Sequence, residues 1–152
     1  MFWQKKQKIE MIEVPLKIIE LEFDNYHILV EGNFRDGSSA FWVIDTGASK
    51  TVLDKNLTNH YELIETDNPN DYQSAGINQE MMETSVGKLA YLSFGDLKIE
   101  NRKVALIDLN HVNEIYSKYT TCRIAGLLGS DILMQFECKI DYECKTLKFI
   151  KR

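Results

Sequence analysis

The chain has little of several features that would mark it as a particular class of protein. It contains only two prolines among 152 residues and no stretch rich in glycine or serine, so we expect one domain without linkers. Its longest apolar run is far shorter than a bilayer is thick, and we therefore expect no membrane span. Basic residues number 18 against 23 acidic ones, and the resulting net charge of −5 offers no electrostatic case for nucleic-acid binding.

Cysteine is also scarce, and its spacing suits neither crosslinks nor metal. Cys122, Cys138 and Cys144 are an odd number without a Cys-x-x-Cys pair, which argues against a disulfide framework and a structural zinc site. The simplest interpretation is free thiols in a reducing compartment, although Cys138 and Cys144 flank a predicted turn and could meet there. No apolar segment follows the basic N-terminus, so we expect a cytoplasmic protein unless a signal peptide has already been removed.

What the sequence does contain is a succession of short strands separated by turns. Residues 26–31 alternate in polarity, and residues 35–38 carry the Asp-Gly pair of a tight hairpin turn. Residues 40–44 are a continuous apolar run, typical of a strand buried on both faces. Further strands are predicted over residues 51–53, 72–94 (as a long hairpin), 103–107, 139–142 and 146–150.

Two short helices interrupt the strands. Apolar residues recur at helical spacing from Val112 to Tyr119, and again from Ile132 to Phe136, where Ser130 is the expected N-cap. The sequence therefore predicts an all-β domain over residues 1–152 with one or two short helices, in which residues 1–10 are a frayed extension.

The segment that carries chemistry begins where the apolar strand ends. An ionisable side chain such as Asp45 is costly at that place unless it is hydrogen-bonded or functional. Gly47 has no Cβ, so its N–H can approach a carboxylate closely, and the Ser49 hydroxyl can donate to a carboxylate oxygen. Thr46 supplies a second hydroxyl, which can bond the neighbouring backbone. Taken alone, the segment could also be an Asp-initiated turn at a strand end.

This segment resembles the active-site signature of aspartic proteases, in the Ala-containing form of the retropepsin-like (retroviral-type) members. The matching residues are Asp45, Thr46, Gly47, Ala48 and Ser49. Downstream, Leu127, Leu128 and Gly129 are similar to the family's hydrophobic-hydrophobic-Gly segment, which folds over the catalytic loop and leads into a helix.

The resemblance extends over residues 14–150, and the terminal hairpin is similar to that of bacterial single-domain members. It implies a closed retropepsin-like β-barrel with a flap hairpin. It implies neither a metal nor any other cofactor.

The resemblance also implies a mechanism that needs two chains. Two-lobed aspartic proteases carry two Asp-Thr/Ser-Gly motifs and this chain has one, so a two-Asp site requires a symmetric homodimer. The two Asp45 carboxylates would share a proton, activate a water and polarise the scissile carbonyl. Thr46 would then hydrogen-bond across the dimer, Gly47 would hold the carboxylates coplanar, and Ser49 would support the outer carboxylate oxygen.

The flap is predicted over residues 74–85, above a peptide or protein substrate bound as an extended strand. The residues expected there are Ala75, Gly76, Ile77, Met81 and Met82, and the two methionines suit ordinary packing as well as a substrate pocket. The segment has less glycine than the family's flap. That leaves open a peptide-binding or scaffolding module with little hydrolytic activity, or a half-barrel that pairs with a different chain.

Overall fold

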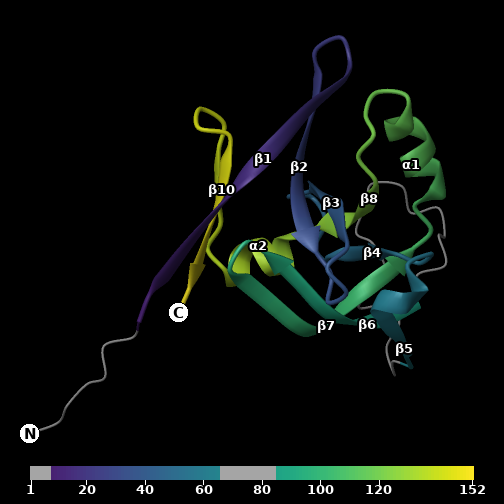
Figure 1. Ribbon diagram of the computed structural model, residues 1–152, viewed down its shortest axis with the longest axis vertical. Coiled ribbons are helices and arrows are strands. Elements are labelled where there is room, and N and C mark those ends of the chain that lie inside the picture. The colour runs from purple at the N-terminus through teal and green to yellow at the C-terminus, as the bar shows by residue number, and fades with distance from the viewer. Residues whose placement is uncertain (1–7, 66–84) are drawn as a thin grey trace, which may run out of the picture.

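The computed structural model describes residues 8–65 and 85–152, which fold mainly into strands (Figure 1). These strands form a ten-stranded sheet in the order β5-β6-β7-β4-β8-β3-β2-β1-β10-β9. In chain order the elements are β1 (Glu10–Glu22), β2 (Asn25–Asn33), β3 (Ser39–Ile44), β4 (Val52–Asp54), the 3-10 helix η1 (Thr58–His60), β5 (Tyr61–Ile64), β6 (Ser85–Phe94), β7 (Leu97–Ile107), α1 (Asn110–Ser117), β8 (Ile124–Leu128), α2 (Ser130–Gln135), β9 (Lys139–Asp141) and β10 (Thr146–Lys151).

Strand β1 is long because it contributes to two hydrophobic cores. Its first half pairs with β10 and buries Ile12, Val14 and Leu16 in the larger core. Its outer half pairs with β2 and buries Ile19 and Leu21 in the smaller core, beside α1. Since successive side chains of a strand face opposite sides, the change from even to odd buried positions moves β1 from one core to the other.

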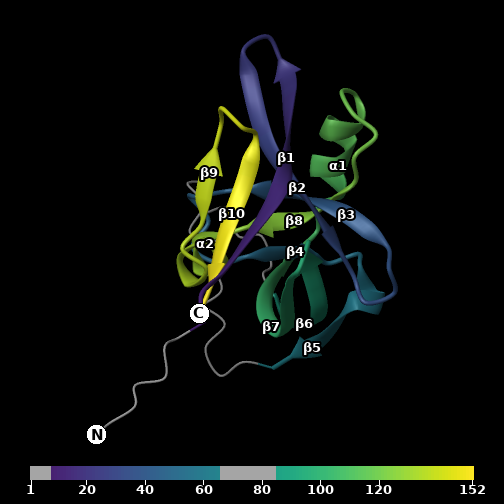
Figure 2. The same cartoon turned by 60° about the vertical axis from the view of Figure 1, so that its left-hand side comes forward.

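The sheet curls so that two strands far apart in its order meet. β2 pairs along its length with β1 and β3, and it also meets β6 at the single pair of Asn33 and Ser93 (Figure 2). The larger core lies inside this curl and includes the fully buried Trp42 and Phe94, whose rings contact edge to face. The predicted mostly-β class is confirmed.

Several turns and helices were predicted correctly from short-range residue patterns. The turn at residues 35–38 has Gly37 at a φ of 86°, and Phe34 N–H donates to Ser38 O at 2.8 Å. The two helices lie where the spacing predicts them. The N-cap of α2, however, is Gly129 and not Ser130, and no side chain caps this helix. Ser130 is the first helical residue instead, and its N–H, which has no acceptor inside the helix, donates to Ala48 O at 2.8 Å.

All three cysteines are free, with Cys122 buried, Cys138 half-buried and Cys144 exposed. In the described part of the chain, no helix has both the length and the apolar character to cross a membrane.

Candidate active site

Asp45 stands at the end of β3, where two backbone contacts fix its position. Its N–H donates to Leu128 O at 3.0 Å, which continues the parallel pairing of β3 with β8. Its carbonyl accepts the Ala48 N–H at 3.1 Å, and its Oδ1 accepts the Gly47 N–H at 3.0 Å. Residues 45–49, named here the Asp45 loop, therefore form a tight turn that holds a half-buried carboxylate with one oxygen already bonded.

The two strands joined by this loop do not lie next to each other, because β8 is inserted between them. β8 runs parallel to β3 and antiparallel to β4. Gly126 makes the insertion possible, since a Cβ there would lie 2.0 Å from Val52 O and 2.4 Å from a ring carbon of Trp42. No residue larger than glycine fits at this position without displacing the backbone of β4.

The chain that leaves β8 crosses directly over the Asp45 loop. A Cβ on Gly129 would lie 2.7 Å from the carbonyl carbon of Lys50 and 2.9 Å from Ala48 O, both of them backbone atoms. Leu128 is fully buried and Leu127 is half-buried. The structure thus places Leu128 and Gly129 against the Asp45 loop, while Leu127 pairs with Val43 and Val52 in the strands on either side of it.

Thr51 joins the Asp45 loop to this crossing segment, a role that the sequence analysis did not assign to it. It is fully buried, and its hydroxyl accepts the Gly129 N–H at 3.1 Å while donating to Asp131 Oδ1 at 2.7 Å. Asp131 lies in the first turn of α2, where the helix dipole favours a negative charge. The available signal was a hydroxyl residue directly before the apolar residues of β4.

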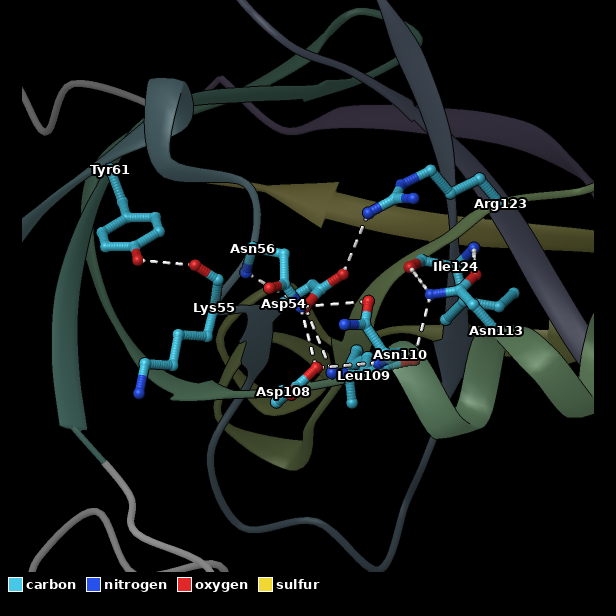
Figure 3. Close-up of polar contacts among 10 residues, drawn as sticks. All are labelled: Asp54, Lys55, Asn56, Tyr61, Asp108, Leu109, Asn110, Asn113, Arg123 and Ile124. Atoms are coloured by element: carbon cyan, nitrogen blue, oxygen red, sulfur yellow. Dashed lines mark hydrogen bonds and ion pairs between the residues drawn. The ribbon is translucent and has the colours of Figure 1, made fainter.

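A fully buried acid, Asp54, lies at the far end of β4 (Figure 3). Its Oδ1 accepts hydrogen bonds from the Leu109 N–H at 3.1 Å and from the backbone and side-chain amides of Asn56 at 3.2 and 2.8 Å. Its Oδ2 pairs with the half-exposed Arg123 guanidinium at 3.1 Å. These donors satisfy a carboxylate that would otherwise be costly to bury.

The network around Asp54 extends to the start of α1 (Figure 3). The Asn56 side-chain amide also donates to Asp108 Oδ1 at 2.8 Å and to Asn110 Oδ1 at 3.2 Å. The Asn110 N–H and the Asn56 amide, both donating to the Asp108 carboxylate, hold its pKa below the usual value. Asn113 of α1 binds both backbone groups of Ile124, at 2.8 and 3.0 Å.

Strand β8 is consequently held at both ends. Arg123 and Ile124 at its start are bonded to Asp54 and Asn113, and Gly129 after its end is bonded to Thr51. Because β8 in turn supports the Asp45 N–H, these contacts set the position of the Asp45 loop. Sequence reasoning missed Asp54 and Asn113, because Leu109 and Arg123 lie 55 and 69 positions from Asp54, and Ile124 lies 11 positions from Asn113.

The other predicted site residues divide into two groups. Thr46 and Ser49 are exposed, and within residues 8–65 and 85–152 neither hydroxyl makes a hydrogen bond, so Ser49 does not support Asp45 inside one chain. The predicted flap lies outside the described residues except for Ser85, the first residue of β6. The predicted flap residues Ala75, Gly76, Ile77, Met81 and Met82 all lie outside the described residues.

Across the described ranges, no three His, Cys, Asp or Glu side chains come close enough together to hold a metal ion.

Comparison with known proteins relates these features to a family. The family described as "Aspartyl protease" matches residues 30–132, a range that spans the Asp45 loop, β8 and the start of α2. No curated protein sequence matches the chain significantly. Among solved structures, a retropepsin-like aspartic protease from Rickettsia conorii is similar in fold, with a TM-score of 0.54 and 15% sequence identity over 98% of this chain and 97% of that one. The protein therefore belongs to the aspartyl protease family and has a retropepsin-like fold.

Proposed function

We propose that the protein is an aspartic endopeptidase that hydrolyses peptide bonds with a water held between two Asp45 carboxylates of a symmetric homodimer. The observation that supports this best is the state of the Asp45 carboxylate. Oδ1 is held by the Gly47 N–H, the side chain is half-buried, and within the described residues Oδ2 has no hydrogen-bond partner. A fixed carboxylate with one oxygen available is what activation of a water requires.

One carboxylate cannot act as base and acid in the same step, and the chain carries a single Asp-Thr-Gly motif. Two Asp45 side chains at a two-fold axis would share one proton, because two close carboxylates do not both ionise readily. The ionised Asp45 takes a proton from water as the water oxygen attacks the carbonyl carbon. The protonated Asp45 donates to the carbonyl oxygen, and when the C–N bond breaks a proton passes to the leaving amine.

The exposed hydroxyls of the Asp45 loop fit the dimer. Thr46, which makes no hydrogen bond within the described residues, would bond across the two-fold axis, and Ser49 would reach a carboxylate oxygen in the assembled site. Substrate would bind as an extended strand beneath a flap at residues 74–85. A closed β-barrel behind the site is supported by the pairing of Asn33 with Ser93, because this pairing joins β2 to β6, two strands that are far apart in the order of the sheet.

The test is cleavage of a diverse peptide library, read by mass spectrometry from acidic to neutral pH. It is run at a protein concentration where light scattering shows the dimer. We expect Asp45→Asn to lower the cleavage rate by at least about 10³-fold, as loss of a catalytic group does. Asp108→Asn, which changes an exposed acid of the α1 network, is the matched control and should cleave like the wild type.

Two outcomes would contradict the proposal in different ways. Equal cleavage by the wild type and Asp45→Asn would mean that another group does the chemistry. A confirmed dimer that binds peptides without cleaving them would instead favour the peptide-binding or scaffolding module.

A further inference from the structure

Strand β1 has an open edge beyond the point where β10 leaves it. The Leu16 N–H donates to Lys145 O at 2.9 Å, directly before β10 begins. In an antiparallel pair, the N–H and C=O of one residue point to the same neighbour, and the direction alternates from residue to residue. The main-chain groups of Ile18 and Glu20 therefore point to the same side as those of Leu16, while the residue between them faces β2.

The chain turns away from β1 at Lys145. This residue has a φ of 54°, which takes the backbone out of the line of β10. In both ribbon views the β9–β10 turn and the β1–β2 hairpin project separately from the molecule (Figures 1 and 2). Among residues 8–65 and 85–152, no main-chain hydrogen bond joins Ile18 or Glu20 to the turn at residues 142–145. Two N–H and two C=O groups of β1 are thus available to a further strand.

A cleft of about 500 Å³ lies at the same edge. Its lining residues are Ile18, Glu20, Tyr26, Tyr142 and Lys145. Ile18 is half-buried, and the two tyrosines are each more than half exposed. Unpaired main-chain groups with an apolar and aromatic surface beside them are the features that an added strand uses, the first for affinity and the second for specificity.

The order of these residues along β1 specifies the chemistry of the strand that fits. A strand that continues the line of β10 runs antiparallel to β1, so its residue opposite Glu20 precedes its residue opposite Ile18, and its carboxyl end meets Lys145. Directly opposite side chains share one face of a sheet, so a basic side chain suits Glu20 and an apolar one suits Ile18. The ammonium group of Lys145 suits a terminal carboxylate.

We infer that the open edge of β1 at Ile18 and Glu20 binds the extended carboxyl-terminal segment of a partner protein, in which a Lys or Arg stands two residues before an apolar last residue. The segment adds a strand beside β1, with its basic side chain at Glu20, its apolar side chain in the cleft beside Ile18, and its carboxylate at Lys145. Binding at this edge does not depend on cleavage at Asp45.

The experiment measures binding of the peptide GSTVKVF, labelled at its amino end and free at its carboxyl end, by fluorescence anisotropy. Mass spectrometry verifies that the peptide stays intact. N-methylation of its Phe removes the N–H that would donate to Ile18 O and should weaken binding by at least about tenfold. N-methylation of the preceding Val is the matched control, because that N–H points away from β1. Equal losses for the two modified peptides, or no loss for either, overturn the inference.

A charge exchange locates the peptide on the protein. The wild type should prefer GSTVKVF over GSTVEVF by about two- to fivefold, and Glu20→Lys should reverse that preference. Amidation of the peptide's carboxyl end should weaken binding to the wild type but not to Lys145→Met. Lys118→Met, which changes an exposed lysine at the end of α1, is the control and should behave like the wild type. An unchanged preference in Glu20→Lys, or a wild type that binds neither peptide, overturns the inference.

This inference and the proposed function fail separately, because binding is measured on an uncleaved peptide. A chain that binds GSTVKVF with the expected charge preference but cleaves no library peptide refutes the protease and leaves the inference. Asp45-dependent cleavage by a chain that does not bind GSTVKVF refutes the inference and leaves the protease.

Discussion

The Thr51 hydroxyl donates a hydrogen bond of 2.7 Å to Asp131 Oδ1, although 80 positions separate the two residues in the chain. The same hydroxyl oxygen accepts the N–H of Gly129. One buried side chain thus fixes both the segment that covers the Asp45 loop and the first turn of α2. The geometry of the motif depends on a hydroxyl that lies outside it.

Replacing Thr51 by valine should test this dependence. The variant keeps the shape of the side chain but leaves the Gly129 N–H buried without an acceptor, which costs about 1–3 kcal/mol of the free energy of unfolding. Thr51→Ser retains the hydroxyl and should lose less. Urea unfolding measures both, and equal losses for valine and serine would show that the hydroxyl is unimportant.

Gly126→Ala should be among the most damaging single substitutions in the chain. The new Cβ would lie 2.0 Å from Val52 O, a backbone atom that cannot rotate away, so β4 and β8 would have to separate. We expect a loss of about 3 kcal/mol or more, at the upper end of overpacking effects, measured by thermal unfolding. Gly37→Asn is the control, because the space around Gly37 is open and asparagine tolerates a positive φ. A wild-type melting temperature for Gly126→Ala would contradict the inserted position of β8.

Asp54→Asn should cost far more stability than Asp108→Asn. Asp54 is fully buried and holds Arg123, Asn56 and Leu109, so a neutral amide loses the ion pair and leaves donors mismatched. We expect a loss of at least about 2 kcal/mol in the free energy of unfolding at neutral pH. Asp108 is exposed and shares only part of the network. Similar losses for the two variants in urea would argue against a special role for Asp54.

The burial of Tyr116 should lower the free energy of unfolding of the protein at alkaline pH. Its hydroxyl bonds to His27 Nδ1 at 2.8 Å, and burial raises its pKa from 10.0 to about 12. The folded state therefore favours the protonated phenol. The resulting stabilisation is complete below pH 10 and disappears as the pH rises toward 12.

Urea unfolding between pH 8 and about pH 11.5 measures whether the free energy of unfolding falls as the pH rises. Tyr116→Phe should show a shallower fall of stability with pH, whereas Tyr119→Phe, which changes a partly exposed tyrosine of the same region, should follow the wild type. Parallel curves for Tyr116→Phe and the wild type would refute the assignment.

The thiols should differ in reactivity in the folded protein. Cys144 is exposed, Cys122 is buried, and burial raises the pKa of Cys138 to about 12, so little of that thiol is ionised near pH 8. A disulfide reagent should modify one cysteine quickly and all three after unfolding in urea. Cys144→Ser should abolish the fast phase, and a fast phase that persists would contradict the burial of the other two.

Much of the fold follows from short-range signals. The Asp-Gly pair of residues 35–38 set a turn because it favours the positive φ found at Gly37. The spacing of apolar residues placed α1, α2 and the terminal hairpin, because periodicity within a few residues decides which side of an element faces a core. The same local reasoning was wrong by one residue at Ser130, because α2 has Gly129 as its N-cap and no side chain caps it.

The sequence by itself determined the Asp45 loop and the apolar strand before it, since a carboxylate, a glycine and a buried strand in immediate succession restrict each other. Only the tertiary structure decided which strands become neighbours of that loop. The switch of β1 between two cores, the insertion of β8 beside Gly126, and the bonds of Thr51 and Asp54 all join distant segments. Such contacts depend on how whole strands pack against each other. The residue pattern of one segment does not specify which distant segment fits its surface.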